Sequence, residues 1–373
     1  MQYSEYKVNK HVLTQGLICL IVEYDGVGNL FHFMFLKGIS EKIASNSPGG
    51  RMKKTLIILA VLALVLASPL MAGGAGESAG GTLRFGTGGD QGTYYGFGNV
   101  LAQRISSETG TQVVAVVSAG SQDNIEMMDM GSYQLGFVQT DVMSYAYNGT
   151  NLFAELGAIT DFSTVAALYL EQVQIVTLDP SIKTVADLEG KTVSIGSSGS
   201  GVYYNALDIL AAYGLTESDI TPTYQSFGDS VDALQDGKID AAFVVAGAPT
   251  VAVSTLATTH DVRLVSIDDE HMDALLEASP YYTPYTIPAS VYGTDDDCQT
   301  VAVGAVIIAR NDVSEDAVYD VVSTIFNDRE AIAQSHDKGN ELDLAFATSI
   351  TTVPYHPGAA RYFAEQGIEV PSL

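Results

Sequence analysis

Apolar and polar positions follow two alternating periods along most of the chain, and this alternation predicts an open α/β sheet. Short apolar runs are each followed by a stretch in which apolar residues recur every three or four positions. The first strands are expected at 82–86, 112–117 and 135–138, each followed by a helix. The second of these runs has no polar interruption, so we expect it to be buried on both faces. The order of elements predicts the α/β fold class.

Two adjacent apolar runs, 164–170 and 173–178, separate this alternation from a second one of the same kind. We interpret them as the place where the chain crosses between two lobes. Lobe I is then formed by 82–168 and 303–373, and lobe II by 169–302. The prediction is a two-lobed α/β protein with a ligand cleft between the lobes.

One segment, 279–299, fits neither period. It contains three prolines and four tyrosines. A loop of this length without structure of its own is often a binding loop, and the alternative is that it covers a sheet edge.

A glycine-rich turn joins strand to helix in both alternations. The first turn runs from Gly86 to Gly92, and the second from Gly196 to Gly201. Glycines let the backbone approach a ligand, and the helix that follows offers unpaired N–H groups and a partial positive charge. One such turn can equally be a tight connection and nothing more. Two of them in one chain predict two lobes that face one anion.

The start of the chain looks like a targeting signal. Residues 52–75 contain two lysines, an apolar run too short to span a bilayer, and then small residues, as in a secretory signal peptide. We interpret 1–51 as a non-native upstream extension and 76–81 as a flexible leader. The alternative is a genuine cytoplasmic extension on a membrane-anchored protein.

Charge and cysteine content narrow the function classes. The full chain has a net charge of −27, and without residues 1–72 it has 10 basic and 40 acidic side chains, a net of −30. Such a surface repels a phosphate backbone, so we expect no nucleic acid partner. Export would leave Cys298 alone, and no cysteine lies between 52 and 92 to carry a lipid. We expect a free, monomeric, periplasmic protein.

Motifs of catalysis are missing from the sequence. The chain has no G-x-S-x-G elbow and no phosphate loop of the G-x-x-x-x-G-K-[ST] type. In the first turn, Gln91 stands where a dinucleotide-binding loop has its third glycine. We therefore expect no enzyme activity, no cofactor and no metal.

Several separate stretches, in this order, carry a resemblance to a known family. They are Thr87–Gly89, Gly92–Tyr95, Gln139–Val142, Gly199–Gly201 with Asn205–Ala206, Asp240–Val244 and His356–Ala359. With these motifs the chain resembles the TAXI family, the solute receptors of tripartite ATP-independent periplasmic (TRAP) transporters. The resemblance implies a type II periplasmic-binding-protein-like fold that closes over a small carboxylate, such as glutamate or a related organic acid, and passes it to a membrane TRAP permease. It also implies that no single arginine grips the ligand.

The candidate ligand-binding residues lie at strand-to-helix junctions, where open α/β sheets bind their ligands. They are Gly88, Gly89, Asp90, Gly92, Thr93 and Tyr94 in lobe I, Ser121, Asn124, Gln139 and Asp141 at further junctions, and Gly199, Ser200 and Gly201 in lobe II. We expect Ser121 to cap the helix that it begins. Asp141 suits an α-amino group of a ligand, and helix N-capping is the alternative reading.

Two departures from the family pattern affect ligand choice. Asp90 and Gln91 stand where the family usually has Thr-Gly, so a carboxylate either turns outward to cap the helix or recognises a positive group. Val202 replaces a hydroxyl residue. A receptor for an ATP-driven (ABC) importer, or an enzyme on the same two-lobed scaffold, is the alternative function.

Overall fold

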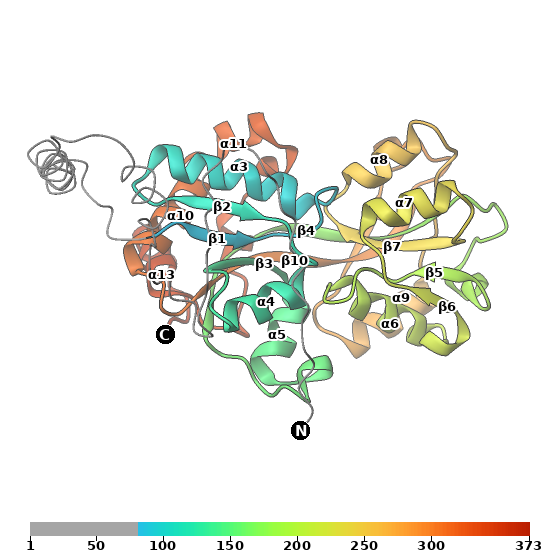
Figure 1. The fold of residues 1–373 in the computed structure, drawn as a ribbon, viewed down its shortest axis with the longest axis horizontal. Helices are drawn as coiled ribbons and strands as arrows, with labels where there is room; N and C mark the ends of the chain where they lie inside the picture. The colour runs from blue at the N-terminus through green and yellow to red at the C-terminus, as the bar shows by residue number, and fades with distance from the viewer. Residues whose placement is uncertain (1–80) are drawn as a thin grey trace, which may run out of the picture. The chain divides into compact units, whose positions relative to one another are not determined.

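Ten strands form one mixed sheet in residues 81–373, the part of the chain that the computed structural model describes. The strand order is β2-β1-β3-β10-β4-β7-β5-β6, with β8 beside β4 and β9 beside β10. Helices cover both faces of the sheet (Figure 1). The expected upstream extension, signal peptide and leader up to residue 80 lie outside the described residues. Within 81–373 no helix has the length and apolarity that crossing a bilayer requires.

The first lobe is built on three parallel strands in the order β2-β1-β3. They are β1 (Leu83–Gly86), β2 (Val113–Val116) and β3 (Leu135–Gln139), followed by the helices α3 (Thr93–Glu108), α4 (Ser121–Asp129) and α5 (Thr140–Asn148). Each strand is followed by a helix, after a turn in the case of β1 and β2, and α3 lies on the opposite face of the sheet from α4 and α5 (Figure 1). The carboxyl ends of the three strands consequently meet at one edge.

The second lobe repeats this plan. Its parallel strands are β5 (Thr192–Ser194), β6 (Thr221–Thr223) and β7 (Ala241–Ala246), with the helices α6 (Val202–Ala212), α7 (Phe227–Gln235), α8 (Val251–Ala257) and α9 (Asp269–Ala278) and the short strand β8 (Arg263–Leu264). Figure 1 shows the second lobe beside the first, with its helices also on both faces of the sheet.

Two long antiparallel strands, β4 (Phe162–Thr177) and β10 (Cys298–Arg310), run through both lobes. In the first lobe β10 pairs with β3, and in the second lobe β4 pairs with β7. The two apolar runs of the sequence are therefore one strand. The buried apolar side chains change from one core to another between Tyr169 and Val173 on β4 and between Val303 and Ala305 on β10. We propose to place the lobe boundaries there, near 169 and 302.

After β10 the chain returns to the first lobe as four helices. They are α10 (Glu315–Asn327), α11 (Arg329–Ser335), α12 (Leu344–Ala347) and α13 (Pro357–Glu365). Of these, α10 and α11 pack against α3, and α12 and α13 pack against β4. Five short 3-10 turns complete the described elements: η2 (Asn151–Phe153), η3 (Val185–Leu188), η4 (Glu217–Asp219), η5 (Ala289–Val291) and η6 (Asp337–Glu341).

Two expectations about strands change. The prediction that 112–117 is buried on both faces is wrong, because β2 is the edge strand of the first lobe and Val114 is 45% exposed. The unassigned segment 279–299 contains β9 (Thr283–Ile287), which pairs antiparallel with the first residues of β10. Of the two readings of this segment, the structure favours the cover of a sheet edge.

Candidate functional site

A cavity of about 80 Å³ lies between the two lobes. It is lined from the first lobe by Gly88, Gly89, Gly92, Thr93, Tyr94, Ser118, Ala119, Gly120, Ser121 and Gln139, from the second by Ser197, Ser200, Gly201, Val202, Ser226, Phe227, Val245 and Ala246, and at the crossing by Glu171. At roughly 10–15 Å³ for each water-sized position, the space suits a compound of few atoms.

Five helices begin at this cavity. Their N-cap residues are Gly92 (α3), Gly120 (α4), Gln139 (α5), Gly201 (α6) and Ser226 (α7), and all five line the cavity. Only in α7 does the N-cap side chain accept a backbone N–H of the first turn. The first N–H groups of a helix have no partner inside it, and its dipole places a partial positive charge there. The walls of the cavity are therefore suited to hold an anion.

Glycine is needed at two of these caps for different reasons. Gly120 has a φ of 117°, a conformation that other residues rarely adopt. Gly201 has an ordinary φ, but a Cβ there would lie 1.8 Å from Oε1 of Gln139 on the opposite lobe. The first glycine lets the chain turn into α4, and the second lets the lobes approach each other.

Several polar side chains face the cavity without a charge. Both Gln139 and Ser200 are more than nine-tenths buried. Nevertheless, Oε1 of Gln139 and Oγ of Ser200 have no hydrogen-bond partner among the described residues. Such groups are costly to leave unpaired unless a ligand or water completes them. No lysine, arginine or histidine contributes to the lining. Neutral donors and main-chain groups must therefore supply the recognition.

The one carboxyl group in the lining belongs to Glu171, on β4 where the strand passes between the lobes. Oε2 of Glu171 accepts a hydrogen bond of 2.6 Å from the Tyr94 hydroxyl. Burial is the main cause that raises the pKa of Glu171 to about 8, and the bond from Tyr94 opposes this shift. At neutral pH this carboxyl is largely protonated.

Aromatic stacking holds Tyr94 in place. Its ring lies parallel to that of Phe137 at 4.6 Å between centroids, and Phe137 stacks in turn on Phe85 at 4.9 Å. All three side chains are buried. This stack joins α3, β3 and β1, so the core of the first lobe sets the position of the hydroxyl that contacts Glu171.

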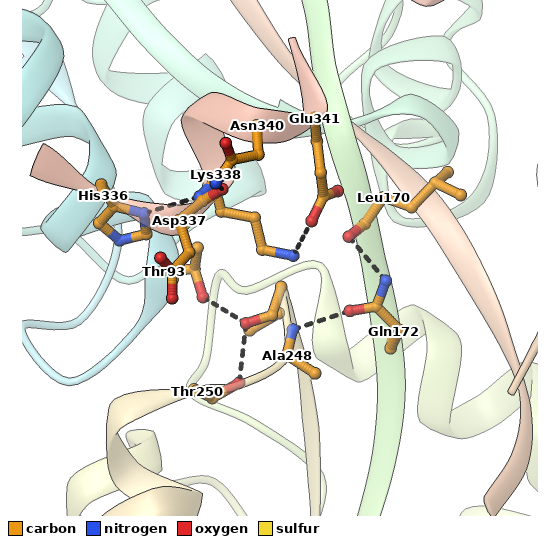
Figure 2. Close-up of polar contacts among 12 residues, drawn as sticks. Thr93, Leu170, Gln172, Ala248, Thr250, His336, Asp337, Lys338, Asn340 and Glu341 are labelled. Carbon is orange, nitrogen blue, oxygen red and sulfur yellow. Dashed lines mark hydrogen bonds and ion pairs between the residues drawn. The ribbon is translucent and has the colours of Figure 1, made fainter. Parts of the chain in front are cut away.

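Beside the cavity, hydrogen bonds join α3, β4 and the loop after β7 (Figure 2). The Thr93 hydroxyl donates to the carbonyl of Gly247 at 2.8 Å, and the Ala248 N–H donates to Oε1 of Gln172 at 2.7 Å. From η6, Lys338 packs against Gly247 and pairs with Glu341 at 2.5 Å. These hydrogen bonds thus connect β4 and the loop after β7 with α3, whose N-terminus faces the cavity.

Further contacts join the lobes on the other side. The Asp123 N–H donates to the carbonyl of Gly199 at 3.0 Å, and Nδ2 of Asn205 donates to Oδ2 of Asp141 at 2.9 Å. The two lobes are therefore in direct contact on either side of the cavity.

Nine of the thirteen residues predicted as ligand-binding line the cavity together: Gly88, Gly89, Gly92, Thr93, Tyr94, Ser121, Gln139, Ser200 and Gly201. Ser121 does not cap α4, since Gly120 is the N-cap and Oγ of Ser121 instead accepts the N–H of Gln139 at 3.1 Å.

Four predicted residues lie elsewhere. Asp90 is exposed and caps no helix, because the N-cap of α3 is Gly92. Asn124 is buried beneath the turn, where Nδ2 donates to the carbonyls of Thr87 and Phe137. Gly199 contacts the other lobe through its carbonyl. Asp141 is completely buried against Asn205, so it neither caps α5 nor lines the cavity.

Sequence reasoning missed Glu171, the loop around Gly120, and the second-lobe residues Ser197, Ser226 and Phe227. A signal for Glu171 was present, since an acid in the middle of a run expected to be buried needs a reason. The N-cap of α7 could also have been found, because Ser226 precedes an apolar helical face.

Asp141 predicts a dependence of stability on pH. Burial raises the pKa of this carboxyl to about 7, against the weaker opposing effect of hydrogen bonding, which includes the bond from Asn205. Between pH 4 and 7 the unfolded chain loses this proton while the folded protein keeps it, so stability falls as the pH rises. Opening of the lobes relieves part of the cost. We expect Asp141→Asn to be more stable than the unchanged protein at pH 8 by roughly 2 kcal/mol.

Denaturant unfolding at a series of pH values measures this difference. The two proteins should become equally stable near pH 3, where Asp141 carries the proton in the folded and in the unfolded state. A constant difference at all pH values would show that the carboxyl is not the cause.

The comparisons with known proteins give one family and a set of similar folds. The NMT1-like family matches residues 85–367. The alkanesulfonate-binding protein SsuA of Xanthomonas axonopodis pv. citri is 18% identical, with 76% of this chain and 90% of that chain covered and a TM-score of 0.44. SsuA of Escherichia coli is 19% identical, with 77% of this chain and 91% of that chain covered and a TM-score of 0.42. An arginine-specific periplasmic binding protein of Salmonella typhimurium is 15% identical, with 69% of this chain and 99% of that chain covered and a TM-score of 0.42. At these scores no role of a residue passes from those proteins to this chain.

Proposed function

The chain belongs to the NMT1-like family and has the two-lobed α/β fold of periplasmic solute-binding receptors, and from that premise we propose that it captures a small carboxylate outside the cytoplasm and delivers it to a membrane permease. One observation carries the proposal. Five helix N-termini from both lobes meet at one cavity whose lining contains no basic side chain.

The energetics support anion capture in spite of the acidic surface. The chain has a net charge of −27, but solvent and salt screen distant surface charges within about 10 Å. Each helix N-terminus favours an anion by about 0.3–2 kcal/mol, and hydrogen bonds from N–H groups to a carboxylate add to this. Several such contacts together give a usable affinity without an arginine.

The transporter class is the finer part of the proposal. We propose a TRAP permease of the TAXI type as the partner, because the motifs Gly92–Tyr95, Gln139–Val142 and Gly199–Gly201 resemble those receptors. The predicted signal peptide at 52–75 supports a periplasmic location, and the receptor would act as a monomer. Transport into vesicles containing a TRAP permease, compared with an ABC importer, separates this partner from the alternative.

A ligand panel tests the function itself. We expect isothermal titration calorimetry to show saturable binding of at least one small carboxylate among acetate, lactate, pyruvate, succinate, glutarate, 2-oxoglutarate and glutamate. The corresponding amides and alcohols, which lack the anion, should not bind. Binding of none of these acids, or turnover of any of them, would refute the proposed receptor function.

Closure gives a second test at Gly201. Replacement by alanine places a methyl group against the amide of Gln139 on the other lobe, and we expect separation of the lobes to remove this overlap. Overpacking of this kind costs about 1–3 kcal/mol, so we expect ligand affinity to fall about 10–100-fold with little change in melting temperature. Gly110→Ala, at a site with no neighbour within 4 Å, is the control that should leave both unchanged. Equal affinity in the two variants would mean that ligand binds without this closure.

A further inference from the structure

The carboxyl group of Glu171 stands in a cavity whose other features favour an anion. Its residue is 2% exposed, and it lies on the strand β4, opposite Val303 of β10, where the chain passes between the lobes. Oε2 accepts from Tyr94, whereas Oε1 has no hydrogen-bond partner among the described residues. An acid in this position needs an explanation, because an ionised Glu171 would repel the ligand that the helix N-termini attract.

One group near Glu171 carries a compensating charge, Lys338, and its effect on the pKa of Glu171 is smaller than that of burial. Tyr94 on α3 donates a hydrogen bond, Tyr169 on β4 is neutral with an unpartnered hydroxyl, and Asp141 on α5 adds negative charge. The nearby cation, Lys338 on η6, is paired with Glu341 and lies over the ring of Tyr169 at 5.4 Å. No helix N–H donates to Glu171 among the described residues. The surroundings therefore favour the neutral acid, in agreement with a pKa near 8.

We propose that Glu171 holds the ligand carboxylate as the protonated acid, with its O–H group as the donor, so that the receptor binds the anion and one proton together. This rests on the proposed function and specifies its chemistry. Tyr94 occupies Oε2, which leaves Oε1 to carry the proton toward the cavity. Two carboxyl groups that share one site keep one proton between them, because both cannot be ionised at short distance. The proton comes from the solvent and stays on Glu171 until the lobes open.

The ligand class follows from this role. A carboxylate without an amino group is sufficient, because the site supplies only hydrogen-bond donors to it. The opposite reading is an ionised Glu171 that pairs with the ammonium group of an amino acid. The two readings predict opposite proton movements, so calorimetry can separate them.

The experiment uses a carboxylate from the panel that binds and that has no amino group, such as glutarate or lactate. The carboxyl group of lactate titrates at about pH 4 and does not interfere above pH 6, whereas for glutarate, whose second carboxyl group titrates above pH 5, the comparison starts at about pH 7. We expect affinity to be constant between pH 6 and 7 and to fall about tenfold for each pH unit above 8. Titrations at pH 9 in buffers of different ionisation enthalpy should show uptake of about one proton per ligand.

Substitution identifies the group. Glu171→Gln keeps a donor in the same place and cannot ionise, so we expect its affinity to stay within about tenfold of the original at pH 7 and to be constant up to pH 9.5. Glu171→Leu removes the donor and should weaken binding more than Glu171→Gln does. Asp141→Asn is the control, because Asp141 also titrates between the lobes, and it should keep the loss of affinity above pH 8.

Three results would overturn the inference while leaving the receptor function intact. They are release of a proton on binding, an affinity that stays constant up to pH 10, and binding of glutamate or alanine but not of glutarate or lactate. Failure of every carboxylate to bind would instead refute the proposed function. The proton measurement needs no variant, so it remains decisive if Glu171→Gln does not fold.

Discussion

Replacement of Ser197 by aspartate is expected to abolish ligand binding, with affinity reduced by a factor of several hundred. Ser197 lines the cavity from the second lobe and is half-buried, so the added carboxylate can be solvated in the open form but not in the closed one. Two like charges about 5 Å apart repel by about 3 kcal/mol at an effective dielectric constant of 20. Burial of the new charge on closure adds to this cost. Titration calorimetry with the best ligand measures the loss.

Two controls isolate the charge. Ser197→Asn has the size of aspartate without its charge, and we expect it to weaken binding by less than about tenfold. Ser314→Asp adds a carboxylate at the N-cap of α10, which is exposed and remote from the cavity lining. It should leave binding unchanged, since aspartate is a good N-cap residue. Equal losses of affinity in Ser197→Asp and Ser197→Asn would show that the cavity selects its ligand by shape and not by negative charge.

The parts of the site that the sequence predicts are those made by the backbone. Gly88, Gly92 and Gly201 belong to strand–turn–helix units, whose order along the chain fixes where the turn lies in the sheet. Because parallel strands end at one edge, their turns meet there whatever the side chains are. Local pattern is sufficient for this inference. It also places a crossing between the lobes at 164–178, although the two apolar runs expected there form the single strand β4.

Side-chain direction is what the sequence could not supply. Asn124 and Asp141 occupy the first turns of helices beside the cavity, as Tyr94 does, yet they point into the first lobe or toward Asn205. The difference is set by neighbours distant in sequence, such as the carbonyls of Thr87 and Phe137. A pattern of spacing contains no information on which of these partners is present.

Glu171 shows the same limit from the other side. It lies within an apolar strand and follows no glycine, so no turn motif selects it. Its place in the cavity depends on the crossing of β4 and β10 between the lobes, a feature of the whole sheet. The acid was visible in the sequence, but its role requires the position of the Tyr94 hydroxyl and of the helix N-termini.

Replacement of Phe137 by alanine is expected to cost about 4 kcal/mol of unfolding free energy and to weaken ligand binding as well. The ring is completely buried and stacks on both Phe85 and Tyr94. Phenylalanine-to-alanine changes in cores cost about 3–5 kcal/mol, and each stacked pair adds about 0.5–1.5 kcal/mol beyond its buried area. Chemical denaturation measures the loss of stability.

The weaker ligand binding is expected because the ring of Tyr94 loses the ring of Phe137 on which it stacks. Among the described residues, the Tyr94 hydroxyl is the donor to Oε2 of Glu171. Phe363→Ala, in the same lobe core but in edge-to-face contact with Tyr355 and Tyr362, is the matched control. Both variants should lose similar stability, and at a temperature where both are folded only Phe137→Ala should bind ligand more than tenfold more weakly. If both variants bound ligand equally well, the aromatic stack would support the lobe without positioning the cavity. A selective loss would instead connect the core of the first lobe to the acid on the hinge strand, through one tyrosine hydroxyl.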